Sequence, residues 1–89
     1  PVLLEKNIKR IKEMIANGSQ IIFTTARHID THSITEKMLL DIGFVDFKLI
    51  SGLPNAKRIL INDYNEANPY PRAIAVNIKR NVDNLGDFI

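Results

Sequence analysis

The chain has no cysteine and no tryptophan, and only 4 glycines and 4 prolines among its 89 residues. The lack of cysteine excludes disulfide scaffolds, thiol catalysis and cysteine-ligated zinc, and it suits a reducing cytoplasm, which is where we expect the protein. No apolar run approaches the roughly 20 residues of a transmembrane helix, so we expect no membrane partner. An apolar content of 45% favours one folded domain over a disordered chain.

Charge is nearly balanced, with 12 basic and 10 acidic residues and a net charge of +2. This slight positive balance helps an anionic ligand to approach, but it lies far below the excess that is typical of nucleic-acid binding. We therefore expect a small anionic partner and no nucleic acid.

Hydrophobic periodicity predicts two helices. The first covers residues 4–17, where apolar residues recur at helical spacing, and Gly18 stands where a helix commonly ends. The second covers residues 34–41 and ends at Gly43; Ser33 and Glu36 before and within it have the spacing of a capping box.

Four short apolar runs predict strands, at residues 20–24, 45–50, 58–62 and 73–77. These runs are solidly apolar instead of alternating, which favours a parallel sheet covered by helices. We therefore predict one α/β domain over residues 1–89, a three-layer, Rossmann-like, mostly parallel sheet with helices on both faces. The candidate core aromatic residues are Phe23, Phe44, Phe47 and Phe88.

Ligands of such sheets bind outside the carboxyl ends of the strands, so the residues that follow each strand are the candidate site. Thr25, Ala26, Arg27 and His28 follow the first predicted strand. A hydroxyl donor and a bidentate guanidinium suit a phosphate group. Asp63 follows the third predicted strand, and a carboxylate there suits Mg²⁺, which prefers carboxylate oxygens, water and substrate phosphate.

Two of these segments resemble motifs of the haloacid dehalogenase superfamily of phosphohydrolases. Residues 21–27 (Ile-Ile-Phe-Thr-Thr-Ala-Arg) resemble its second motif, an apolar strand that ends in a phosphate-binding Ser or Thr. Residues 58–63 (Arg-Ile-Leu-Ile-Asn-Asp) resemble its fourth motif, an apolar strand that ends in a Mg²⁺-binding acid. The two predicted helices also fall where that family has helices.

The resemblance implies a Mg²⁺-dependent phosphohydrolase that acts on a small phosphorylated metabolite through an aspartyl-phosphate intermediate. It implies that Thr25 binds the transferred phosphoryl group and that Asp63 is a metal ligand, with Glu66 as the candidate second acid. The family's third motif is a lysine; Lys57 is a displaced candidate for that role, with Lys48 behind it. The loop of residues 68–71 (Asn-Pro-Tyr-Pro) favours a sugar phosphate as substrate.

The family's first motif, D-x-D, which carries the nucleophilic aspartate, does not occur in this sequence. In the family's sheet order, 5-4-1-2-3, the strand with that motif lies in the middle. We therefore expect the domain to be incomplete at its N-terminus, with the nucleophile supplied by a preceding segment.

Other interpretations remain open. The chain could be a non-catalytic relative that keeps the fold as a binding or regulatory module. Thr25 and Arg27 could form a capped turn with a surface arginine, and Asp63 could simply shape a turn. His28 and His32 have the spacing of a helical metal pair, but no third ligand is apparent.

Overall fold

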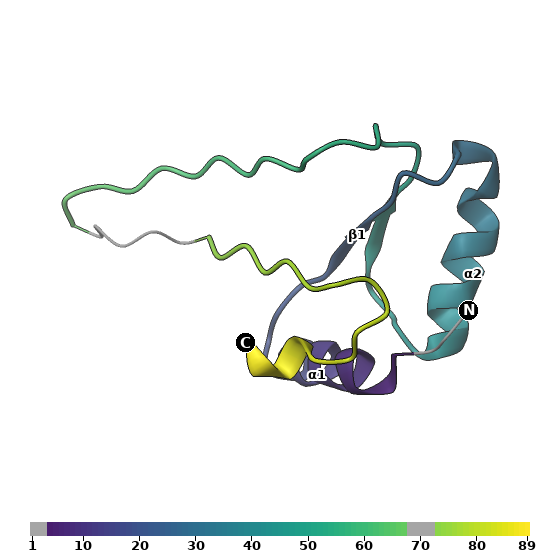
Figure 1. Cartoon of the computed structure of the whole chain (residues 1–89), viewed down its shortest axis with the longest axis horizontal. Helices are drawn as coiled ribbons and strands as arrows, with labels where there is room; N and C mark the ends of the chain where they lie inside the picture. The colour runs from purple at the N-terminus through teal and green to yellow at the C-terminus, as the bar shows by residue number, and fades with distance from the viewer. Residues whose placement is uncertain (1–3, 68–72) are drawn as a thin grey trace.

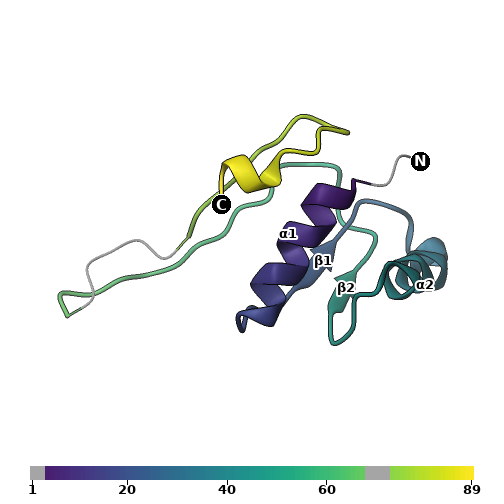
Figure 2. The ribbon, with the colours of Figure 1, turned by 90° about the horizontal axis from the view of Figure 1, so that it is seen from below.

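The computed structural model describes residues 4–67 and 73–89. Two helices and a short sheet form a body, and residues 55–67 and 73–78, which we call the arm, project from that body (Figure 1). The arm points away from the sheet in the perpendicular view as well (Figure 2), and the molecule measures 45 × 27 × 26 Å. The loop of residues 68–71 lies outside the described residues.

Helix α1 spans Glu5–Ala16, in agreement with the predicted periodicity, and Gly18 after it has the expected positive φ of 102°. Leu4 at the N-cap position offers no side-chain acceptor. The C-terminal segment provides one: the Asp83 carboxylate accepts hydrogen bonds from the backbone N–H of Lys6 (3.1 Å) and Asn7 (2.7 Å). A carboxylate at this position satisfies free N–H groups and complements the positive end of the helix dipole.

The buried Asn7 side chain fixes the same C-terminal segment. Its amide donates to the carbonyl oxygen of Val82 (3.0 Å) and accepts from the N–H of Leu85 (2.9 Å). The short 3₁₀-helix η2, Leu85–Asp87, is thereby held against α1, as both views show (Figure 1, Figure 2).

Strands β1 (Ile22–Thr24) and β2 (Lys48–Ile50) are parallel neighbours, with Ile22 opposite Lys48 and Thr24 opposite Ile50. Both lie inside the predicted strands. The connection between them passes through the 3₁₀-helix η1, Ile29–Thr31, and helix α2, His32–Ile42. Helix α2 ends at Gly43 in the left-handed conformation, with φ of 108°, as the sequence predicted.

The predicted capping box is wrong. Ser33 lies inside α2, the N-cap residue is Thr31, and no side chain caps the helix. The preceding turn of 3₁₀-helix leads the chain into α2 and moves its start upstream of Ser33. Glu36 is therefore free to face another residue of the same helix.

The core is an aromatic cluster between the sheet and the end of α2. Phe44 is 3% exposed, and its ring meets Phe23 edge-to-face at 5.0 Å; Phe47 meets Phe23 in the same manner at 5.5 Å. Leu39 of α2 is the other buried apolar side chain of the described residues. Phe88, by contrast, is 55% exposed, so its predicted core role is wrong.

The predicted three-layer, Rossmann-like sheet is also wrong. In the described part of the chain the sheet has two strands, and residues 58–62 and 73–77 belong to no helix or strand. Ile59, Leu60 and Ile61 are 73–87% exposed, because among the described residues no strand pairs with their backbone and covers their side chains. Within the described ranges no helix is long and apolar enough to cross a membrane.

Replacement of Phe44 by alanine tests the aromatic core. We expect Phe44→Ala to lower the free energy of unfolding by about 3–5 kcal/mol, because it removes a buried ring and leaves a cavity. Val45→Ala is the control, because Val45 is 64% exposed and should change stability by no more than about 0.5 kcal/mol. Urea denaturation followed by circular dichroism measures both; equal losses would contradict the assigned core.

Candidate functional site

The pairing of β1 and β2 continues beyond their last residues and places the next residues side by side. The N–H of Thr25 donates to the carbonyl oxygen of Ile50 (3.0 Å), and the N–H of Leu53 donates to the carbonyl oxygen of Thr25 (3.2 Å). The N–H of Gly52 donates to the carbonyl oxygen of Arg27 (2.8 Å). Thr25 and Ser51 therefore lie next to each other at the carboxyl ends of the two strands.

Thr25 has a hydroxyl proton available for a ligand. Its Oγ1 accepts a hydrogen bond from the N–H of Arg27 (3.1 Å), which fixes the turn and leaves the O–H free to donate. Arg27 is exposed, and no other described residue forms a hydrogen bond or an ion pair with its guanidinium. Ala26 lies between them and is exposed. The sequence predicted that Thr25 and Arg27 follow the first strand, and in the structure both residues come after the end of β1.

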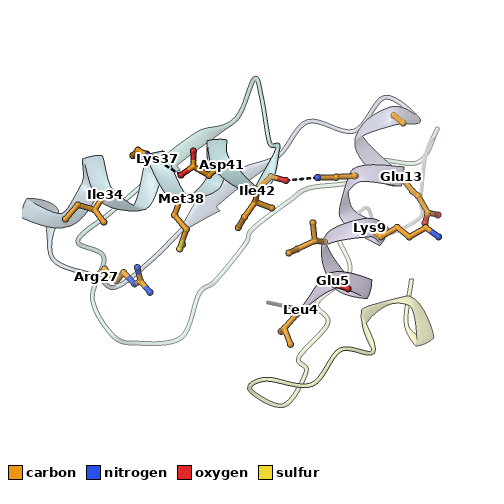
Figure 3. A pocket seen from close by; sticks show the side chains of 13 residues that line it. Leu4, Glu5, Lys9, Glu13, Arg27, Ile34, Lys37, Met38, Asp41 and Ile42 are labelled. Atoms are coloured by element: carbon orange, nitrogen blue, oxygen red, sulfur yellow. Dashed lines mark hydrogen bonds and ion pairs between the residues drawn. The ribbon is translucent and has the colours of Figure 1, made fainter. Parts of the chain in front are cut away.

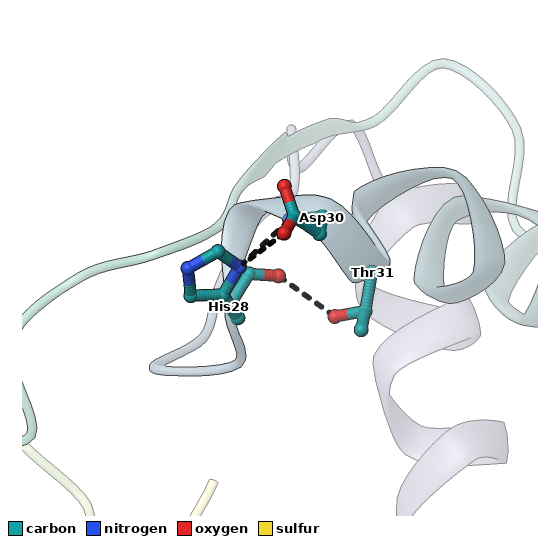
Figure 4. Close-up of polar contacts among 3 residues, drawn as sticks. All are labelled: His28, Asp30 and Thr31. Carbon is teal, nitrogen blue, oxygen red and sulfur yellow. Dashed lines mark hydrogen bonds and ion pairs between the residues drawn. The ribbon is translucent and has the colours of Figure 1, made fainter.

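His28 is the N-cap residue of the 3₁₀-helix η1. Its Nδ1 accepts a hydrogen bond from the N–H of Asp30 (3.2 Å) and lies 3.2 Å from the Asp30 carboxylate, while its carbonyl oxygen accepts from the Thr31 hydroxyl (2.8 Å; Figure 4). Both side chains are largely exposed, so this contact adds little stability. The ring serves the local turn here, and its role in substrate binding stays a prediction.

Three predicted site residues, Lys57, Asp63 and Glu66, lie on the arm and are exposed. The arm leads away from the carboxyl ends of β1 and β2 (Figure 1). Among the described residues no hydrogen bond or ion pair joins these three side chains to Thr25. Among residues 4–67 and 73–89, no three or more His, Asp or Glu side chains form a group that could hold a metal ion. The metal roles of Asp63 and Glu66 stay predictions. Lys48 opens β2, at the opposite end of that strand from Ser51.

The strand ends also hold a polar network that the sequence interpretation missed. His32 Nδ1 lies 2.8 Å from the Ser51 hydroxyl, and His32 Nε2 lies 3.6 Å from the Glu36 carboxylate. The i, i+4 spacing of His32 and Glu36 was the available signal for one contact, although the predicted helix began only at residue 34 and left His32 outside it. The other contact, between His32 and Ser51, joins residues 19 positions apart, and it depends on the parallel pairing of β1 and β2. His28 and His32 have different polar partners: His28 contacts Asp30 and Thr31, whereas His32 contacts Ser51 and Glu36.

A groove of about 1330 Å³ lies between α1 and α2 (Figure 3). Leu4, Ile8, Ile34 and Met38 give it apolar walls, and charges of both signs surround them. Lys12 Nζ bridges the helices by donating to the carbonyl oxygen of Ile42 (2.7 Å). Arg27 lines the groove beside Ile34 and Met38. Apolar walls surrounded by both positive and negative side chains do not indicate a particular ligand. The carboxyl ends of β1 and β2 are therefore the stronger candidate site.

Comparison of the chain with models of known protein families, with curated protein sequences and with solved structures found no match.

Gly52 shapes the turn at this site. Its φ is +74°, which side chains with a Cβ rarely adopt. We expect Gly52→Ala to lower the free energy of unfolding by about 1–2 kcal/mol through backbone strain. Gly86→Ala is the matched control, because no atom lies within 4 Å of a Cβ built there and its φ is not positive. Thermal unfolding of both variants checks this; equal stability of the two would contradict the assigned turn.

Proposed function

We propose that the turn after β1 binds the phosphate of a small phosphorylated metabolite. The observation that carries the proposal is the position of Thr25 at the carboxyl end of a parallel strand. Among the described residues its hydroxyl proton has no acceptor, and the guanidinium two residues on has no partner. Hydroxyl and guanidinium donors suit the oxygens of a phosphate, and a net charge of +2 favours its approach.

We further propose that this turn is the substrate-binding part of a Mg²⁺-dependent phosphohydrolase that acts through an aspartyl-phosphate. Thr25 and Arg27 hold and orient the phosphate oxygens, which is the main contribution of protein groups to phosphoryl transfer. No aspartate directly follows β1 or β2, so these strand ends do not provide the attacking carboxylate. The proposal therefore requires a nucleophilic aspartate that these two strand ends do not supply. The cysteine-free chain suits a reducing cytoplasm as the compartment.

The metal part of this proposal rests on the chemistry of the arm. Asp63 and Glu66 offer two carboxylates, and Mg²⁺ is commonly held by one or two carboxylates together with water and phosphate oxygens. Lys57 at the base of the arm offers a positive charge for the same phosphate. These donors match Mg²⁺ in type, but their positions on the arm do not form a site with Thr25. The ion supplies charge neutralisation when it is bound.

The second candidate is a non-catalytic module that binds a phosphorylated compound for regulation. Its support is that Thr25 and Arg27 need no nucleophile to bind phosphate, and that the sequence has no D-x-D motif. Phosphate binding without release of phosphate from an aryl phosphate, in the full-length natural protein with Mg²⁺, would favour this module over the enzyme.

Substitution of Thr25 tests phosphate binding. We expect Thr25→Val to weaken the binding of inorganic phosphate by about ten- to a hundredfold, because it removes a hydrogen bond to a charged group while it keeps the side-chain shape. Thr25→Ser is the control and should retain binding, because it keeps the hydroxyl. Isothermal titration calorimetry measures both; equal affinities for the valine and serine variants would contradict the proposed role.

The metal role of Asp63 is tested by the effect of Mg²⁺ on phosphate affinity. If Asp63 holds Mg²⁺ against the bound phosphate, the ion should tighten phosphate binding by about tenfold in the unmodified chain, because it offsets the charge of the phosphate. Asp63→Asn should abolish this tightening and leave metal-free binding unchanged. Asp46→Asn is the control, because Asp46 is an exposed carboxylate in a turn with φ of 53°, which asparagine tolerates. A Mg²⁺ effect that persists in Asp63→Asn would reject Asp63 as the ligand.

A further inference from the structure

A row of three polar side chains lies beside the proposed phosphate site. Ser51 follows β2, His32 opens α2, and Glu36 lies one turn further along that helix. The Ser51 hydroxyl is 2.8 Å from His32 Nδ1, and His32 Nε2 is 3.6 Å from the Glu36 carboxylate. The His32 side chain is 34% exposed and that of Glu36 is 51% exposed, so a ligand can reach both.

The Glu36 carboxylate favours one tautomer of His32, and this tautomer sets the direction of the hydrogen bond between His32 and Ser51. Glu36 favours the tautomer of His32 with its proton on Nε2, because that N–H points toward a negative charge. His32 Nδ1 then accepts the hydroxyl proton of Ser51. The hydroxyl oxygen of Ser51 and the carboxylate of Glu36 keep free lone pairs, so the row accepts hydrogen bonds.

This arrangement discriminates between two parts of a ligand. A phosphate offers acceptors and negative charge, and the Glu36 carboxylate repels it. A sugar hydroxyl has a proton to donate and lone pairs to accept with, and it has no charge, so it fits a row of hydroxyl, imidazole and carboxylate. The row therefore suits the neutral part of a ligand and not its phosphate.

The sheet places the row beside Thr25. Thr24 lies opposite Ile50, and the Thr25 N–H donates to the Ile50 carbonyl oxygen. Thr25 and Ser51 are therefore neighbours at the ends of the two adjacent strands. Side chains alternate along a strand. Both residues are half-buried like Phe23 and Leu49 two positions earlier, which places the two hydroxyls on the same face of the sheet.

We propose that Ser51, His32 and Glu36 form a hydroxyl-binding subsite, and that the ligand is a polyhydroxylated phosphate such as a sugar phosphate. The phosphate binds at Thr25, on the side of Arg27, and the hydroxyl groups of the same molecule bind at Ser51, on the side of Glu36. This inference rests on the proposed phosphate site and adds the residues that select the rest of the ligand.

Comparison of three ligands tests the subsite: inorganic phosphate, phenyl phosphate and glucose 6-phosphate, each titrated by calorimetry against the whole chain. We expect Ser51→Ala and Glu36→Gln each to weaken glucose 6-phosphate binding about three- to tenfold. Ser51→Ala removes a neutral hydrogen bond, and Glu36→Gln keeps an acceptor oxygen but removes its charge. Binding of the other two ligands should not weaken. Ser33→Ala is the matched control, because Ser33 is an exposed hydroxyl on the same helix.

The possible outcomes separate this inference from the proposed function. Glucose 6-phosphate affinity that is unchanged in Glu36→Gln, an exposed substitution that does not threaten folding, would overturn the subsite. Equal weakening of all three ligands by Ser51→Ala would overturn it too, because Ser51 would then belong to the phosphate site. In both cases Thr25→Val still reports on phosphate binding. Absence of binding of any of the three to the unmodified chain would overturn the proposed function and the subsite together.

Discussion

Because β1 and β2 run parallel, the chain between them must return along the length of the strands, and α2 provides that return. The crossover carries Phe44 and Phe47 back to the sheet, where both meet Phe23. The same pairing brings Thr25 beside Ser51, and α2 starts with His32 beside Ser51. The aromatic core and the polar groups at the strand ends therefore have one geometric origin.

Both helices could be predicted from the sequence because their signals are local. An apolar stripe and a glycine that accepts a positive φ, Gly18 or Gly43, require only neighbouring residues. The starts of the helices are different. Asp83 caps α1 from 76 positions away, and a 3₁₀ turn precedes α2, so the serine at the expected capping position has no capping role. Local spacing does not encode such contacts.

The prediction of the sheet failed where strands need partners that are far away in the sequence. The segment at 58–62 has the composition of a buried strand, but β-propensity expresses how well side chains pack against neighbouring strands. In the described residues no neighbour is present, and the apolar side chains are exposed. Asp63 follows this segment, so the same missing pairing that leaves the segment outside the sheet also leaves the predicted metal ligand without a place at the end of a paired strand. Thr25 could be located from sequence because its own strand does pair.

Charge at the strand ends sets a direction for any ligand that binds there. Arg27 lies with Ile34 and Met38, on one side of α2, whereas His32 and Glu36 lie four residues apart on its opposite side. A phosphate dianion is attracted to the guanidinium and repelled by the carboxylate, so the two charges favour the same orientation. Neutral hydroxyl groups feel neither charge strongly, and they gain hydrogen bonds from a row in which Glu36 orients His32 and His32 orients Ser51. The opposite charges of Arg27 and Glu36 therefore orient a ligand that carries both a phosphate and hydroxyl groups. An enclosed pocket is not required for this orientation.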